Sequence, residues 1–173
     1  MAVTKAEKAR LINRADRLSF MNTGTSELPT FERMTRFTAM TGGKNPKEYS
    51  RQYVDMTTES SDVVGYAPAV EYSFDRHTMN KVHEKIAQVT DDELVGADTY
   101  VDIVTADLFT EDAQNRAIAR KRTYSIVPDS EGDGTDALIY SGSFKAVSEI
   151  VKGYATTEDG WKTVTFVEGS IPA

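Results

Sequence analysis

The chain has 173 residues and an acidic balance, with 20 lysines and arginines against 27 aspartates and glutamates, giving a net charge of −7. This charge repels a phosphate backbone and argues against a dedicated nucleic-acid binder, and the absence of cysteine excludes disulfides, thiol nucleophiles and Cys-ligated zinc. No apolar run approaches the roughly 20 residues of a membrane-spanning helix, and the N-terminus lacks the apolar region of a secretory signal, so we expect no membrane partner.

Residues 1–24 are expected to form an N-terminal arm before a single domain over 25–173, a length that suits one substantial core. The segment Lys5 to Arg17 is polar, with few apolar residues and neither Gly nor Pro, which favours an arm that contains some helix. A turn-rich stretch, Asn22 to Pro29, follows it.

The first half of the domain is predicted to hold three strands, separated by a break and a long loop. Gly42 to Pro46 separates the first strand from the second. The polar segment Met56 to Asp62 lies in a long loop near 56–68. The third strand alternates apolar and polar residues most clearly, as a half-buried strand does. The expected strands are Phe31 to Thr41, Glu48 to Asp55 and Ala69 to Arg76.

The second half is predicted to hold one helix and a series of strands. Asn80 to Val89 indicates the helix, because Asn80 can cap its first turn and apolar side chains recur on one face. Asp159-Gly160 indicates a hairpin turn, since glycine tolerates the positive φ that tight hairpin turns need. The expected strands are Thr99 to Leu108, Arg116 to Val127, Ala137 to Val147, Ile150 to Thr156 and Trp161 to Val167.

About seven or eight strands with one helix predict a mainly β fold: two packed antiparallel sheets, as a β-sandwich or barrel, with one flanking α-helix. Such sheets have edge strands, whose unpaired N–H and C=O groups are a hazard in a monomer and a resource in an oligomer. A contact between unlike surfaces that is repeated by rotation closes into a ring, and stacked rings form a filament.

A series of motifs runs in order along most of the chain, from about Phe31 to Val167. The motifs are Lys44 to Asp55, Asp62 to Pro68 with Tyr72 to Asp75, Val82 to Ile86, Asp91 to Leu94, Ser130 to Asp136 with Tyr140 to Lys145, and Gly160 to Phe166. In this order, they resemble the motifs of major tail tube proteins of long-tailed, non-contractile (siphovirus-type) phages or prophages.

The resemblance implies a fold shared with type VI secretion tube proteins and a structural role in the virion tail. Copies would form hexameric rings, with their sheets joined edge to edge into an inner β-barrel and the helix outside. Rings would stack into a tube, bridged by the long loop and the arm. DNA would pass through an acidic lumen without specific binding. The other partners would be tail proteins (tape measure, tail terminator and distal tail), and synthesis would occur in the cytoplasm of the bacterial host.

Three sets of side chains are candidates for the surfaces of such a tube. The lumen candidates are Glu48, Ser50, Gln52, Glu71, Ser73 and Asp75. The ring-stacking candidates are Lys44, Lys47, Arg51, Glu59 and Asp62. The subunit-contact candidates are Asp91, Asp92 and Glu93 of one copy with Arg120, Lys121 and Arg122 of its neighbour. The lumen set also fits the polar outer face of an ordinary sandwich, and the three adjacent acids also fit a solvated turn.

Other features that could carry chemistry have simpler interpretations. His77 and His83 could contribute to a metal site, but a packed or solvated position on the helix is the commoner role. The segment Gly132 to Leu138 nearly fits a calcium-binding repeat, but that repeat works in stacked copies, so a turn is favoured. Four aromatic residues could form a ligand platform, although their strand positions favour the core. They are Tyr140, Phe144, Trp161 and Phe166.

These features favour a structural subunit of a phage tail tube. The alternative is a monomeric β-sandwich binding module for carbohydrate or peptide. An enzyme is not expected, because no nucleophile–base pair, phosphate loop or metal motif stands out, and no cofactor is expected either.

Overall fold

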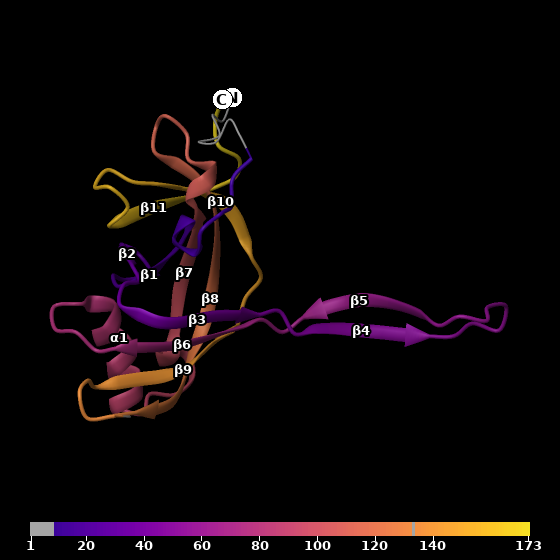
Figure 1. Cartoon of the computed structure of the whole chain (residues 1–173), viewed down its shortest axis with the longest axis horizontal. Coiled ribbons are helices and arrows are strands. Elements are labelled where there is room, and N and C mark those ends of the chain that lie inside the picture. The colour runs from indigo at the N-terminus through magenta and orange to yellow at the C-terminus, as the bar shows by residue number, and fades with distance from the viewer. Residues whose placement is uncertain (1–8, 133) are drawn as a thin grey trace.

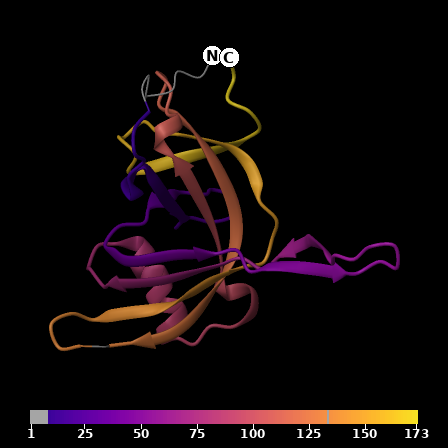
Figure 2. The same cartoon turned by 45° about the vertical axis from the view of Figure 1, so that its right-hand side comes forward.

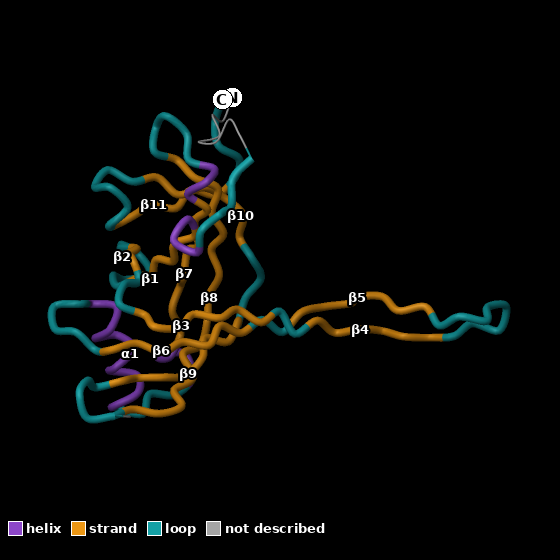
Figure 3. Tube along the Cα trace, in the orientation of Figure 1, coloured by secondary structure: helices purple, strands orange, loops and turns teal. Residues whose placement is uncertain are grey.

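The structure, a computed structural model, describes residues 9–132 and 134–173. They form eleven strands, one α-helix and three 3-10 turns, which are joined by loops (Figures 1 and 3). Nine strands form one antiparallel sheet and two form a separate hairpin. The predicted mainly β class with one helix is confirmed. The strands are β1 (Arg17–Asn22), β2 (Phe31–Arg33), β3 (Phe37–Gly43), β4 (Pro46–Arg51), β5 (Ser60–Tyr66), β6 (Ala69–Asp75), β7 (Tyr100–Asp107), β8 (Arg116–Glu131), β9 (Ile139–Ala146), β10 (Val151–Thr156) and β11 (Thr163–Glu168).

Six of the strands close into a small barrel. Their order is β10-β11-β2-β1-β7-β8, and a further pairing between β8 and β10 returns to the start. The side chains inside are small or apolar, and the four alanines leave room for the large aromatic rings. The buried set is Leu18, Phe20, Phe31, Val104, Ala106, Ala117, Ala119, Ala155, Trp161 and Val164. Closure leaves these strands with no open edge within the barrel.

The 16-residue strand β8 joins the barrel to the rest of the sheet. One side of β8 pairs with β7, while the other side pairs first with β10 and then, from Tyr124 to Glu131, with β9. The strand therefore leaves the barrel and becomes the margin of a four-stranded extension in the order β8-β9-β6-β3 (Figure 2).

Helix α1 (Lys81–Asp91) covers one face of this extension, in agreement with the helix predicted at Asn80 to Val89. The cap is as predicted, because the Asn80 Oδ1 atom accepts a hydrogen bond of 3.2 Å from the His83 backbone N–H. Val82 and Ile86 are fully buried against the aromatic side chains of β6 and β9. Phe74, for example, stacks on Tyr140 with ring centroids 5.5 Å apart.

A long two-stranded ribbon runs from β3 to β6, and its outer half, β4 with β5, projects away from the rest of the molecule (Figure 1). The predicted break at Gly42 to Pro46 lies where the ribbon leaves the sheet. There Asn45 has a φ of 45°. Its side-chain amide donates to the Ala67 carbonyl at 3.0 Å, and its own carbonyl accepts from the Ala67 N–H at 3.1 Å. Asn45 therefore bridges the two strands at the break.

The predicted strand Phe31 to Thr41 is wrong, because this segment forms two strands in different parts of the fold. β2 lies in the barrel and pairs with β1 and β11, whereas β3 pairs with β6 in the extension. The chain turns between them at Arg36, which has a φ of 63°. A left-handed backbone at a residue other than glycine is uncommon, and it changes the direction of the chain here.

Two other boundaries differ from the predictions. The arm was expected to extend to residue 24, but Arg17–Asn22 forms β1 inside the barrel, where Phe20 and Met21 are fully buried. The loop near 56–68 is shorter than expected, because Ser60–Tyr66 forms β5. Of the predicted arm, residues 1–8 lie outside the described part of the chain.

Candidate assembly surfaces

The extension has one covered face and one open face. Tyr72 and Phe74 of β6 point into the core under α1, so the alternate residues of β6 point to the open side. Glu71 of β6 lies opposite Thr41 of β3 and Ser143 of β9. The open face is thus polar and built of short side chains around an acidic residue.

The structure separates the predicted lumen residues into two groups. Glu71, Ser73 and Asp75 lie on the open face of the extension, where Glu71 is exposed and the other two are half-buried. Glu48 and Ser50 lie on the projecting hairpin, and Gln52 follows the end of β4. The register of β4 with β5 puts Glu48 and Ser50 on one face, and the Ser50 hydroxyl donates to that of Ser61 at 3.0 Å.

The extension has two margins that pair with no other strand in the described part of the chain. One margin is β3, which ends the strand order. The other is the outer side of β8 beyond Ser125, because the pairing with β7 stops there. From Val127 onward this side of β8 is exposed. Pro128 supplies no N–H, and the register shifts between Pro128 and Ser130, so the β8 margin is irregular.

The two margins are aligned across the sheet. Phe37 of β3 lies opposite Phe74, Phe74 lies opposite Tyr140, and Tyr140 lies opposite Glu131 of β8. Because β3 and β8 are separated by two antiparallel strands, they also run antiparallel to each other. The beginning of β3 and the end of β8 are therefore at the same end of the extension.

Carboxylates gather at the β8 margin beside the end of α1. The acidic margin consists of Asp91, Asp92, Glu93, Asp129 and Glu131, which are all exposed. Asp91 accepts a hydrogen bond of 3.0 Å from the Tyr140 hydroxyl and lies 3.5 Å from the Arg76 guanidinium. A hydrogen bond with the Asp91 carboxyl raises the pKa of Glu131 above its usual value. The carboxyl groups of Asp91 and Glu131 thus lie next to each other, which is unfavourable when both are ionised.

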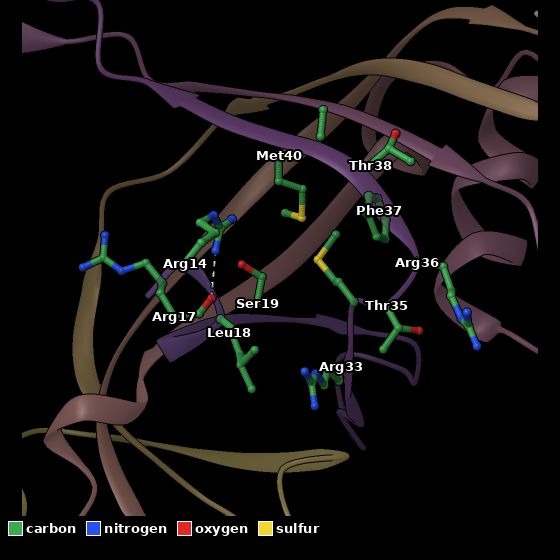
Figure 4. A pocket seen from close by; sticks show the side chains of 13 residues that line it. Arg14, Arg17, Leu18, Ser19, Arg33, Thr35, Arg36, Phe37, Thr38 and Met40 are labelled. Carbon is green, nitrogen blue, oxygen red and sulfur yellow. Dashed lines mark hydrogen bonds between the residues drawn. The ribbon is translucent and has the colours of Figure 1, made fainter. Parts of the chain in front are cut away.

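Arginines gather at the other margin. A groove of about 480 Å³ lies between β1 and β3 and is lined by Arg14, Arg17, Arg33 and Arg36 around Leu18, Met34, Phe37 and Met40. Figure 4 shows Arg14 beside Ser19 and Met40, with Arg17 and Arg36 at opposite ends. The Arg14 guanidinium donates to the Arg17 carbonyl at 2.9 Å. Within the described residues, the guanidinium groups of Arg33 and Arg36 make no ion pair. We call this the arginine groove.

Sequence reasoning missed the arginine groove, because its residues come from two segments whose contact no local pattern reveals. The available signal was four arginines between residues 14 and 36 in a chain that is acidic overall. Three further basic residues were singled out instead, and they lie in the barrel part of β8. Arg120 pairs with the buried Asp107 at 3.1 Å, and Lys121 lies 5.2 Å from the centre of the Phe166 ring. Arg122 pairs with Ile103 in the ladder to β7.

The predicted ring-stacking residues lie on or beside the projecting hairpin. Lys47, Arg51 and Asp62 share the face opposite to that of Glu48, and the Arg51 guanidinium lies 5.6 Å from the centre of the Tyr49 ring. Lys44 precedes the hairpin, and Glu59 lies at its tip. The hairpin also exposes seven large apolar side chains: Tyr49, Tyr53, Val54, Met56, Val63, Val64 and Tyr66. Exposed apolar surface of this extent is typical of contact sites.

His83 has a structural role. It is fully buried, its Nδ1 accepts from the His77 backbone N–H at 3.1 Å, and its Nε2 lies 2.8 Å from the Thr35 carbonyl. These partners fix the neutral tautomer with the proton on Nε2. No group of three or more potential metal ligands occurs among the described residues. The calcium-like segment includes residue 133, which lies outside them.

The aromatic residues that could have formed a ligand platform belong to the core. Trp161, Phe144 and Tyr140 are buried, and Phe166 is half-buried. In the described part of the chain, no helix is both long and apolar enough to span a bilayer.

No protein-family model matches the chain, and no curated protein matches it. Among solved structures, it is similar to a chain in the tail of an empty GTA particle, obtained with helical refinement and C6 symmetry. The TM-score is 0.57 at 11% identity, covering 82% of this chain and 98% of that one. It is also similar to a chain in the 6-fold symmetrised baseplate of the anti-feeding prophage (AFP), with a TM-score of 0.48, 8% identity, and coverage of 84% and 95%. The likeness to the GTA tail chain shows a shared fold.

Proposed function

We propose that the chain is a structural subunit of a phage-type tail tube, in which hexameric rings stack and DNA passes without specific binding. The observation that carries the proposal is the extension, a polar open face between two unpaired margins, in a fold shared with a chain of a C6-symmetric tail. Joining margin to margin would satisfy part of the N–H and C=O groups that each copy leaves unpaired. Repeated by rotation, the contact closes into a ring.

The open face suits the lining of a channel. Glu71 and Asp75 on β6 outnumber Lys145 on β9 among the charged residues of this side. Carboxylates around a narrow passage repel phosphates within a Debye length of about 8 Å at physiological salt. Hydroxyl groups such as that of Ser143 offer no strong site at which DNA could be held.

The projecting hairpin supports contact between rings. Its strands are exposed on both faces, and each of its seven large apolar side chains is 44% exposed or more within one copy. Insertion against the next ring would remove them from water. The tube would lie in the virion tail, with the tape measure, tail terminator and distal tail proteins as further partners, after synthesis in the cytoplasm of the bacterial host.

Electron microscopy of the purified protein at rising concentration tests the proposal, with and without other tail proteins. We expect rings or tubes with six-fold symmetry. A protein that sediments as a monomer under every condition and never forms cylinders would instead favour a monomeric binding module.

A pair of proline variants tests the β3 margin. Neighbouring residues of an edge strand alternate between donating to the partner strand and donating outward. Thr41 and Gly42 are both exposed, and neither has a large side chain to lose. Of Thr41→Pro and Gly42→Pro, one should lower the melting temperature and the other should keep it while abolishing assembly. Normal tubes from both variants would contradict pairing at β3.

A further inference from the structure

The two unpaired margins carry opposite charge at the same end of the extension. Phe37, Phe74, Tyr140 and Glu131 lie opposite one another in a row across the sheet. This row places the arginine groove and the acidic margin at the same height, at opposite edges of the extension. Arg36 directly precedes Phe37, and Asp91 is hydrogen-bonded to Tyr140 in the same row. A rotated second copy would thus bring one margin against the other.

We propose that the acidic margin of one copy docks against the arginine groove of the next, so that charge selects which margins meet. This contact depends on the proposed function only in its closure into rings. It joins two different surfaces of the same chain, which makes it heterologous and directional. A second copy is the occupant that fits, because its acidic margin lies at the height of Arg33 and Arg36, whereas Arg17 of the groove is already paired with Asp107 at 2.6 Å.

Three observations favour charge over a continuous strand ladder as the basis of selection. Pro128 and the shifted register interrupt the β8 margin, so few backbone groups can pair there. Arg33 and Arg36 have no carboxylate partner in the described part of their own copy. The Arg76 guanidinium lies 3.5 Å from Asp91, and a further cation beside the neighbouring carboxyl groups of Asp91 and Glu131 would relieve the repulsion that remains between them.

The acids at the end of α1 were expected to meet Arg120, Lys121 and Arg122 of a neighbour. The structure favours a different partner, because Arg120 is already paired with Asp107. Arg120 and Lys121 also lie on β8 where both sides of the strand are hydrogen-bonded, to β7 and to β10. The groove, in contrast, opens beside the unpaired strand β3.

Charge reversal on each margin provides the test. The groove variant combines Arg33→Glu with Arg36→Glu, and the margin variant combines Asp129→Lys with Glu131→Lys. All four side chains are exposed, so both variants should fold, as circular dichroism and melting would check. Alone, each would place like charges against each other, and we expect its critical concentration for assembly to rise by about tenfold or more.

Mixing the two variants should restore association. The groove variant keeps its acidic margin, which would dock against the unaltered arginine groove of the margin variant. At the next contact, the new lysines of the margin variant would meet the new glutamates of the groove variant, so the two variants would alternate. The control variant carries Glu158→Lys with Lys162→Glu on the exposed turn after β10, and should assemble as the wild type does. Association of the mixture should weaken at 0.5 M salt, where the Debye length falls to about 4 Å.

Sedimentation of the mixture against each variant alone decides the proposal even if no tube forms. Heteroassociation in the mixture supports it. The proposal is overturned if either variant alone self-associates at wild-type concentrations, or if the mixture associates no better than its components. Failure of the wild type to form tubes, with heteroassociation intact, would count against the tail-tube function and leave the charge contact standing.

Discussion

The turn at Asp159 and Gly160 shows how much one short sequence can specify. Gly160 has a φ of 71°, as the predicted hairpin requires, and Trp161 follows at 66°. The Asp159 carboxylate accepts the backbone N–H groups of Lys162 and Thr163 at 3.1 and 3.0 Å. A hydrogen bond from the Thr163 hydroxyl is the largest cause that lowers the pKa of Asp159 to about 2. The carboxylate therefore holds the turn in its charged form.

His83 predicts a dependence of stability on pH. Burial lowers the pKa of His83 below 6.5, and the hydrogen bond to the Thr35 carbonyl, which raises the pKa, offsets this only in part. The charged and titratable groups that face His83 are His77, Arg76 and Asp75. The unfolded chain takes up a proton near pH 6.5 that the folded protein resists, so this contribution is present above that pH and is lost as the pH falls. We expect the melting temperature to drop from pH 7.5 to pH 5.5.

The matched variants are His83→Gln and His77→Gln. The first should flatten the drop in melting temperature, whereas the second should retain it, because His77 is exposed. Equal drops in the wild type and in the His83 variant would refute a role for this side chain.

Among the elements, the hairpin β4–β5 should separate assembly from stability. Replacing Tyr49 and Val64 by threonine removes apolar groups that are already 46% and 65% exposed, so the free energy of unfolding should change by less than about 0.5 kcal/mol per site. Ring stacking should fail, as electron microscopy would show by single rings in place of tubes. Leu28→Thr, at a loop side chain 79% exposed, is the control. Tubes of normal length from the double variant would exclude the hairpin from stacking.

The elements that could be predicted are those with one buried face. β6 alternates buried and exposed residues, and α1 buries one stripe, so their periods are visible in the sequence. β1 was missed because Phe20 faces the barrel while its neighbour Met21 faces the core under α1, which removes the alternation. The sequence predicts a loop at β5, because the hairpin is exposed on both faces and its residues do not alternate between apolar and polar. Nothing in the residues around Arg36 signalled its left-handed backbone.

At the scale of the whole molecule, the barrel and the extension share strands and should unfold together. Along β7, Ile103 belongs to the core under α1 and Val104 belongs to the barrel core, so one strand serves both. The single tryptophan, Trp161, reports on the barrel. Tryptophan fluorescence and the far-ultraviolet circular dichroism of the fold should therefore give coincident melting curves.

Ile86→Ala tests this coupling from the far side. Ile86 is fully buried under the extension, and its truncation should cost about 2–5 kcal/mol. The fluorescence transition of Trp161 should shift by the same amount as the dichroism, although the two residues belong to different cores. Two separated transitions would show that the barrel folds independently.

Of the candidate surfaces, the sequence could supply the acids, which are contiguous at Asp91, Asp92 and Glu93. The sequence alone does not reveal the basic surface that complements these acids, because the arginine groove forms only when β1 and β3 lie side by side in the fold. It also could not show that the hairpin separates Glu48 from Glu71, since both lie on strands with a similar polar pattern. Contacts between distant segments come from the topology, which local periodicity does not encode.

The shifted registers on the two margins lie in one row. The shift on β3 falls between Phe37 and Ala39, the shift on β8 falls between Pro128 and Ser130, and Ala39 and Ser130 are aligned through Ser73 and Ser141. Each irregularity bends and twists its strand locally. In the proposed ring, rotation gives every copy the same orientation, so all of these bends would lie at one level. A stack of such rings would have two different ends before any other component binds to it.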